Sequence, residues 1–204
     1  MIRRPLTLTV ATLCAALALT ACNGSPEAGR PNSTVTASSR TPTPTLSTPA
    51  ATPTWTPEEQ AAITAAKAQY AAARTAAGVA LHDPRTASRD QLEAAGNGGA
   101  WLTSIVERIV FLRDRGLYQS GNAKIVSAST TSVDLAAEQP LVVLKSCIDG
   151  AGVMMRYRAT GKPVPVVTTK DGARHTMSVR LVYATAKTGS KRWFLVEEKA
   201  TGTC

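Results

Sequence analysis

A stretch of 32 residues, from Asn23 to Thr54, limits how much of this 204-residue chain can fold. Threonine, serine and proline dominate it, the run Thr41–Thr45 alternates Thr and Pro, and large apolar side chains are almost absent. Such a composition cannot bury enough apolar surface to offset the conformational entropy lost on folding. We therefore predict that residues 22–54 form a disordered tether and that residues 55–204 form one folded domain.

The segment before the tether has the pattern of an export signal. Arg3 and Arg4 precede an uncharged, apolar-rich stretch from Leu6 to Leu19, about fourteen residues long, which is the length of a signal-peptide core. A membrane-spanning helix needs about 20 apolar residues, so this stretch is short for an anchor. We expect residues 1–21 to be removed as a signal peptide, while an uncleaved anchor helix and cleavage at another site remain open.

The end of this segment, Leu19-Thr20-Ala21-Cys22, resembles the lipobox of bacterial lipoproteins. In that motif an aliphatic residue and two small residues precede a cysteine whose thiol is diacylated and whose amine becomes the mature N-terminus. The resemblance implies an extracytoplasmic protein anchored to the outer face of the cell membrane through lipidated Cys22. Two acyl chains hold a protein stably at a bilayer, whereas one chain does so only marginally.

The four cysteines divide by position. Cys14 lies in the signal core and Cys22 at the lipobox, which leaves Cys147 and Cys204 in the domain. In an exported protein, an even number of cysteines left in the domain favours a disulfide. A metal site is the weaker interpretation, since neither a second cysteine pair nor paired histidines accompany these two. We expect no metal and no cofactor.

The domain is basic. It has nineteen Lys and Arg against thirteen Asp and Glu, a formal charge of +6, and its basic residues are scattered along the sequence rather than gathered in one run. This distribution is typical of a solubilising surface near an anionic membrane, and it argues against nucleic-acid binding. We therefore expect a membrane partner, reached through Cys22, and no nucleic acid.

The first half of the domain predicts three helices. Thr56-Pro57-Glu58-Glu59 combines an N-cap residue, a proline suited to the first helical position and the glutamate of a capping box. Apolar residues then recur at three- and four-residue steps up to His82, where Asp83-Pro84 ends the pattern. Further helices are predicted over Ser88–Ala95 and over about Ala100–Arg115.

After Gly121 the period changes from helical to extended. Runs rich in β-branched or alternating apolar residues predict strands over Lys124–Val133, Leu141–Ile148, Val153–Tyr157, Arg174–Ala186 and Arg192–Glu197. Helices followed by antiparallel strands indicate an α+β domain, in which three N-terminal helices pack on one face of an antiparallel sheet.

Four features follow one another along the domain: Ser146-Cys147-Ile148-Asp149, Gly161-Lys162-Pro163-Val164, Trp193-Phe194-Leu195-Val196 and a terminal Cys204. Together with the element order, they resemble small exported actinobacterial lipoproteins whose domain has the nuclear transport factor 2-like fold, the cone of SnoaL-type and ketosteroid-isomerase proteins. The resemblance covers about residues 57–204. It implies a strongly curved, cone-like sheet and a disulfide between Cys147 and Cys204.

In that fold the cone commonly receives a small apolar ligand or a partner segment. The large side chains that are candidates to line or fill it are Tyr70, Trp101, Met154, Met155 and Trp193. Aromatic residues and methionine also dominate ordinary cores, so core packing is the more ordinary role for each of them.

We expect this domain to act as a non-catalytic ligand-binding or envelope-assembly module. An isomerase- or cyclase-like enzyme is an alternative, which would need a carboxylate or histidine in the cone and a donor for a developing oxyanion. Asp149, His175 and Glu197 lie near strand ends, but turns and solvent-facing strand ends account for them, and no catalytic motif accompanies them.

A self-associating structural envelope protein is a further alternative. The resemblance implies that such a dimer would form through the exposed sheet face. In the segment 174–186, one face carries Thr176, Ser178, Arg180 and Val182 and is mostly polar, which favours solvent or a wet interface. A homodimer therefore remains open.

Overall fold

The computed structural model describes residues 54–165 and 173–204. Within these ranges it has three helices, α1 (Pro57–His82), α2 (Arg89–Ala94) and α3 (Gly99–Asp114). The strands in the same ranges are β1 (Leu117–Ser120), β2 (Lys124–Asp134), β3 (Leu141–Asp149), β4 (Met154–Tyr157), β5 (Arg174–Thr185) and β6 (Lys191–Thr203). The predicted α+β class is confirmed, whereas the predicted signal peptide, the tether and Cys22 lie outside the described residues.

Helix α1 begins as its sequence predicts. The Thr56 hydroxyl accepts a 3.2 Å hydrogen bond from the Glu59 backbone N–H, and the Glu59 carboxylate accepts a 2.8 Å bond from the Thr56 N–H. These two bonds form a capping box, which satisfies backbone donors that a helix start leaves unpaired. The helix ends at His82, before Pro84.

The buried stripe of α1 is narrow because alanine supplies most of it. Ala66, Ala73 and Ala77 are almost fully buried, and Tyr70, at 1 % exposure, is the large side chain among them. Small side chains let a helix approach a sheet closely, so the one tyrosine reaches deep between α1 and the strands.

Helices α2 and α3 are joined by a tight, glycine-rich connection. Ser88 and Gln91 form a second capping box at α2, and α3 starts one residue before the predicted Ala100. Gly99 has φ +53°, and a Cβ placed there would lie 2.8 Å from the Val196 carbonyl oxygen. Only glycine suits this start of α3, because the backbone is left-handed and β6 lies directly against it.

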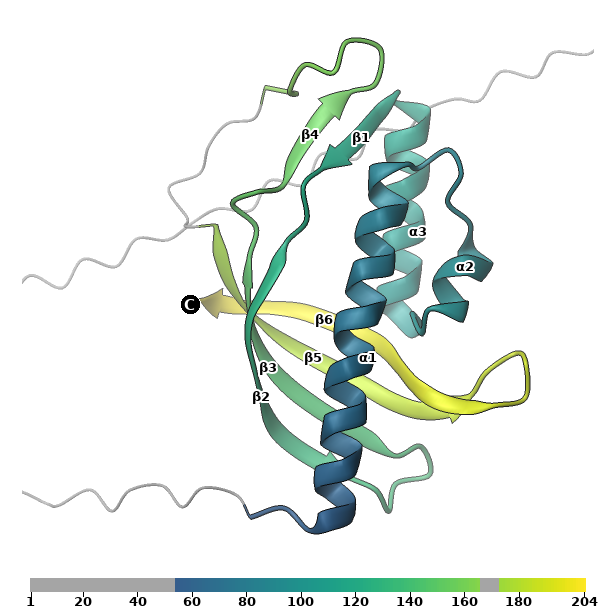
Figure 1. Ribbon diagram of the computed structural model, residues 1–204, viewed down its shortest axis with the longest axis vertical. Coiled ribbons are helices and arrows are strands. Elements are labelled where there is room, and N and C mark those ends of the chain that lie inside the picture. Colours follow the sequence, from purple (N-terminus) through teal and green to yellow (C-terminus); the bar gives the residue numbers. More distant parts are fainter. Residues whose placement is uncertain (1–53, 166–172) are drawn as a thin grey trace, which may run out of the picture. The chain divides into compact units, whose positions relative to one another are not determined.

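Four strands form the main sheet in the order β2-β3-β5-β6, and every neighbouring pair is antiparallel. The strands curve, and α1 crosses the face on which the helices lie (Figure 1). The predicted packing of helices on one face of an antiparallel sheet is therefore confirmed. Strand β6 has a further neighbour, since Asn97 forms a parallel bridge with Leu195.

Strands β1 and β4 form a separate two-stranded sheet beside the helices (Figure 1). The sequence did not predict β1, because four residues between Gly116 and Gly121 are too few to show a strand period. Its partner lies far along the chain, with Leu117 opposite Tyr157. The segment predicted at 153–157 thus leaves the main sheet and pairs with β1.

The apolar interior has two parts. The first lies between α1 and the main sheet and includes Tyr70, Val142, Leu144, Val179, Leu181, Trp193 and Leu195. The second joins the three helices to β1 and includes Ala77, Leu81, Leu92, Leu102, Ile105, Ile109, Leu112 and Leu117. Trp101 packs against both.

The disulfide between Cys147 and Cys204 is present, with 6.0 Å between the two Cα atoms. It forms because β6 continues to Thr203, past the predicted end at Glu197, and carries the C-terminus back across β5 toward β3. Thr176, opposite Cys147 on β5, is buried there and its hydroxyl donates to the Thr203 carbonyl at 3.0 Å.

The other residues predicted on the polar face of β5 divide between solvent and interior. Ser178 and Arg180 are exposed, as expected for a solvated face, whereas Val182 is only 9 % exposed.

None of the helices in the part of the chain that the structure describes is long and apolar enough to cross a membrane.

Candidate functional site

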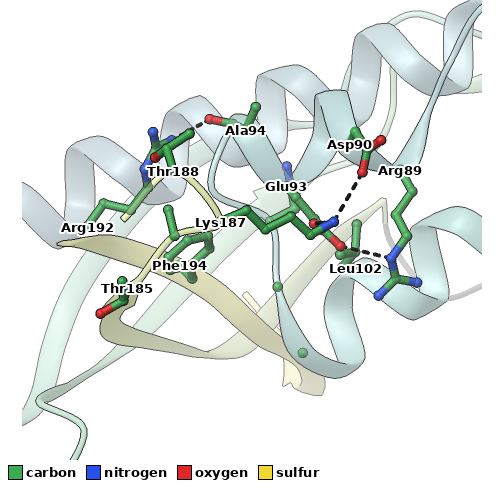
Figure 2. A pocket seen from close by; sticks show the side chains of 14 residues that line it. Arg89, Asp90, Glu93, Ala94, Leu102, Thr185, Lys187, Thr188, Arg192 and Phe194 are labelled. Atoms are coloured by element: carbon green, nitrogen blue, oxygen red, sulfur yellow. Dashed lines mark hydrogen bonds and ion pairs between the residues drawn. The ribbon is translucent and has the colours of Figure 1, made fainter. Parts of the chain in front are cut away.

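A surface pocket of about 400 Å³ lies between α2, the start of α3 and the hairpin that joins β5 to β6 (Figure 2). These three segments are far apart in sequence and meet because the Asn97 segment pairs with β6. The Gly98 N–H donates to the Leu195 carbonyl at 2.8 Å, and the Leu195 N–H donates to the Gly96 carbonyl at 2.9 Å. The pocket is therefore built on a rigid junction between helix and sheet.

The floor of this pocket is apolar. Leu102 of α3 and Phe194 of β6 lie at its base, and Ala94 and Ala186 contribute small side chains to its walls. A concave, mostly apolar surface with a few polar groups at its margin is the usual form of a small-molecule site.

The margin is closed by charged side chains from both sides. Lys187, at the tip of the hairpin, forms ion pairs with Asp90 (3.1 Å) and with Glu93 of α2. Arg89 pairs with Glu93 at 2.9 Å, and Arg192 donates to the Ala94 carbonyl. Lys187 spans the pocket in Figure 2, so these contacts hold the hairpin against α2.

The same contacts determine the charge states at the margin. Hydrogen bonds from Lys187 and Arg89 lower the pKa of the Glu93 carboxyl. Hydrogen bonds to Glu93 and Asp90 raise the pKa of the Lys187 ammonium. Both partners therefore stay charged near neutral pH, and neither is poised to exchange a proton with a bound molecule.

A second cluster of ionisable groups is buried between α1 and β6. The Tyr70 hydroxyl donates a 3.1 Å hydrogen bond to Glu198 Oε1, and the Arg74 guanidinium pairs with the same oxygen. The Glu198 side chain has no exposed surface, and its Oε2 has no hydrogen-bond partner among the described residues. This carboxyl is thus half satisfied and fully desolvated.

Burial raises the pKa of the Glu198 carboxyl, although Arg74 and Tyr70 oppose the change by favouring its charged form. Burial, followed by the nearby Glu198 charge, raises the pKa of the Tyr70 phenol. Groups with shifted pKa values occur at active sites and also in structural ion-pair networks. Whether a ligand can reach Tyr70 and Glu198 therefore decides which of these two roles the cluster has.

That access is limited. A small cavity of about 140 Å³ lies beside the cluster, lined in part by Arg74, Trp101 and Asn122. Neither Tyr70 nor Glu198 lines it. Arg74 therefore separates the carboxyl from the cavity and stacks toward Trp101, with 5.8 Å between the guanidinium carbon and the ring centroid.

The predicted cone residues lie in different places. Tyr70 is in the first core, and Trp101 donates its indole N–H to buried Asn97 at 2.6 Å. Trp193 packs on Tyr183 in a groove of about 430 Å³ beside the start of α1. Met155 packs against the second core, while Met154 is 44 % exposed on β4.

None of these five residues lines the pocket of Figure 2. The sequence did not identify the residues that line this pocket. Asp90, Glu93 and Lys187 have the pattern of ordinary surface residues in the sequence, and only the fold brings them together. Gly98 and Gly99, which lie between the two helices predicted over Ser88–Ala95 and Ala100–Arg115, also border the pocket.

The residues considered for catalysis do not gather. Asp149 pairs with Arg174 at 3.1 Å, and its pKa is lowered by the Ala151 backbone N–H and by Arg174. His175 and Glu197 are exposed. Within residues 54–165 and 173–204, no three His, Cys, Asp or Glu side chains gather as a metal ion would require.

The similarity of this chain to known proteins is limited to its fold. No family model matches the chain, and no curated protein matches it. Among solved structures, the chain is similar to the intermembrane space region of the chloroplast protein ARC6, with 14 % identity and a TM-score of 0.47 over 74 % of this chain and all of that one. At this identity and score the similarity carries no functional implication.

Proposed function

We propose that this protein is a lipid-anchored, extracytoplasmic binding module with a cone-type domain, and that the pocket of Figure 2 is its ligand site. The observation that supports the proposal is an apolar floor, formed by Leu102 and Phe194, beneath a charged margin. On that margin Arg89 and Lys187 pair with the carboxylates of α2, and Arg192 donates to the Ala94 carbonyl. Such a site favours a small, mostly apolar ligand, because the pocket offers little unpaired polar surface.

The location rests on the sequence and on the disulfide. The segment before Cys22 has the features of an export signal, and the resemblance of Leu19-Thr20-Ala21-Cys22 to a lipobox supports an anchor at that cysteine. The bond between Cys147 and Cys204 supports an oxidising, extracytoplasmic compartment, because cytosolic proteins keep their thiols reduced.

Binding is favoured over isomerase- or cyclase-like catalysis by the position of Glu198. Its raised pKa would suit a general base, but its side chain is fully buried and Arg74 stands between it and the small cavity. At the pocket of Figure 2, the pKa shifts of Glu93 and Lys187 hold both groups in their charged forms, so neither is suited to exchange a proton near neutral pH.

A dye-binding experiment tests the pocket. The probe is 1-anilinonaphthalene-8-sulfonate, an anionic dye with apolar aromatic rings, whose fluorescence rises when the rings leave water. Ala94→Trp places a large ring at the pocket wall, and Ala72→Trp places the same ring on an exposed position of α1 that does not line the pocket. We expect Ala94→Trp to abolish dye binding and Ala72→Trp to preserve it; equal binding by both folded variants would contradict the proposed site.

Two further measurements test the biological part of the proposal. Native mass spectrometry of the protein purified from its own host's envelope should reveal a co-purifying small molecule, and that molecule should be lost in Ala94→Trp. Cys22→Ala should move the protein from the membrane fraction to the soluble fraction. Persistence of Cys22→Ala in membranes washed with high salt, which weakens electrostatic attachment, would reject lipid anchoring without affecting the pocket.

A further inference from the structure

One exposed stripe of α3 carries an aromatic ring between two arginines. Arg108 and Phe111 lie on α3, and Arg115 is its C-cap residue. The three are spaced three and four residues apart, so they lie on one side of the helix. All three are exposed, and Phe111 keeps 42 % of its surface in solvent. An exposed phenylalanine on a long helix has a free-energy cost in water that contact with a partner would remove.

The two arginines hold the ring between them. The guanidinium carbon of Arg108 lies 5.5 Å from the Phe111 ring centroid, and that of Arg115 lies 5.6 Å from it. Arg108 Nη2 also lies 3.1 Å from the Met155 sulfur, which joins the stripe to β4. Among the described residues neither arginine forms an ion pair, so both charges are available to an outside anion.

Two carboxylates lie near the stripe and must be weighed against it. Glu107 and Asp114 are seven residues apart and form their own row on α3, on the side of Phe111 away from the two arginines. Phe111 therefore lies between an arginine row and a carboxylate row; the two guanidinium groups are the charges that stack on its ring, and the domain has a formal charge of +6.

We propose that the Arg108–Phe111–Arg115 stripe docks the domain on an anionic phospholipid surface. Arginine binds phosphate oxygens through two parallel hydrogen bonds, and an aromatic ring beside basic residues is typical of segments that lie in the headgroup region of a bilayer. The choice of a membrane as the partner rests on the proposed lipid anchoring, which would keep the domain within reach of a bilayer.

Another basic surface of the domain provides the matched control. Lys145, Ser178 and Lys199 lie in register across β3, β5 and β6, and all three are exposed. This sheet face offers two cations, as the α3 stripe does, but a serine stands between them where α3 has Phe111. A partner that responds only to net charge would not distinguish the two surfaces.

The experiment uses the chain from Asn23 to Cys204, which lacks Cys22 and cannot be acylated. Binding is measured by co-sedimentation with vesicles of phosphatidylglycerol and phosphatidylcholine, and with vesicles of phosphatidylcholine alone. We expect binding to the anionic vesicles only, weakening as salt is added. Equal binding to both vesicles, or binding to neither, would overturn the proposal and leave the lipobox prediction untouched.

Matched charge reversals then locate the surface. Arg108→Glu/Arg115→Glu and Lys145→Glu/Lys199→Glu change the net charge equally. Each arginine near an anionic surface strengthens binding about fivefold, so the α3 variant should lose at least ~25-fold, and the sheet variant much less. Equal losses in the two folded variants would show that net charge alone is recognised and would reject the stripe.

A ring substitution separates a bilayer from other polyanions. Phe111→Ala keeps the charge and should weaken vesicle binding several-fold, because it removes the apolar contact. Phe111→Trp should show an emission blue shift with anionic vesicles that exceeds the wild-type shift. Unchanged vesicle binding by Phe111→Ala, or tighter binding of the chain to single-stranded RNA than to vesicles, would point to a polyanion and against the bilayer.

Discussion

The Tyr70 hydroxyl donates a 3.1 Å hydrogen bond to the Glu198 carboxylate, although 128 residues separate the two along the chain. The bond joins the middle of α1 to the second half of β6, across the first apolar core. Arg74, one helical turn after Tyr70, pairs with the same carboxylate oxygen. This three-residue contact fixes the position of α1 on the sheet, and it is also the most strongly desolvated charge interaction that the structure describes.

Removing Arg74 should destabilise the domain strongly. Arg74→Met leaves the Glu198 charge buried without its cation, and breaking a buried pair in this way costs roughly 3–5 kcal/mol. For a domain of this size each kcal/mol lowers Tm by about 2–4 °C, so a fall on the order of 10 °C is expected by calorimetry. The double variant Arg74→Met/Glu198→Leu should recover most of the loss, and no recovery would contradict this account.

The same carboxyl should give the stability of the fold a distinctive pH dependence. Its folded pKa is raised above the ordinary 4.5, so the folded state binds the proton more tightly than the unfolded state. The stability from this group is fully present below pH 4.5 and is lost as the pH rises through the folded pKa. Urea unfolding should show the wild type losing free energy relative to Glu198→Gln as the pH rises above 4.5.

Comparison with Glu198→Gln is needed because other carboxyls act in the opposite direction. Asp83, Glu93 and Asp149 have lowered pKa values, so their contribution is present above their unfolded pKa and is lost as the pH falls. These three carboxyls are present in both the wild type and Glu198→Gln, so their contributions cancel when the free energy of unfolding of one protein is subtracted from that of the other. A difference that stays constant with pH would show that the Glu198 pKa is not raised.

The contact of α3 with β6 makes Gly99 irreplaceable. A Cβ on Gly99 would meet the Val196 carbonyl oxygen at 2.8 Å, in addition to the strain of a left-handed backbone at φ +53°. Gly189 also has a positive φ, +84°, but a Cβ there meets no atom within 4 Å. Gly189→Ala should cost about 1 kcal/mol, and Gly99→Ala about 1–3 kcal/mol more, in urea unfolding. Equal losses of stability in the two variants would mean that β6 shifts to make room for the added Cβ at position 99.

Reduction of the disulfide should weaken the fold. Cys147 and Cys204 are separated by 57 residues, and closing a loop of that size stabilises a fold by about 4 kcal/mol in the loop-entropy model. Added reductant should therefore lower the free energy of unfolding of the wild type by about 4 kcal/mol, which is measured as a lower urea midpoint. Cys147→Ser/Cys204→Ser should start at the lower midpoint, and a further shift of this variant with reductant would identify an effect other than the disulfide.

Local sequence signals predicted the elements that depend on neighbouring residues. Thr56 and Glu59 cap α1 because they are three residues apart, and the alternation from Arg174 onward predicts β5 because a strand turns each successive side chain to the opposite face. The pairing of β1 with β4 was missed, because its four residues acquire a partner only when the chain folds back.

The amino-acid sequence by itself determined the α+β class and the two cysteines of the domain that bond. The first follows from the hydrophobic period and the second from the cysteine count. Only the tertiary structure decided that Glu198 lies beneath Tyr70 and Arg74, and that Lys187 reaches α2 to close a pocket. Those contacts join residues about a hundred positions apart, and their energies depend on burial and distance, which exist only after the chain has folded.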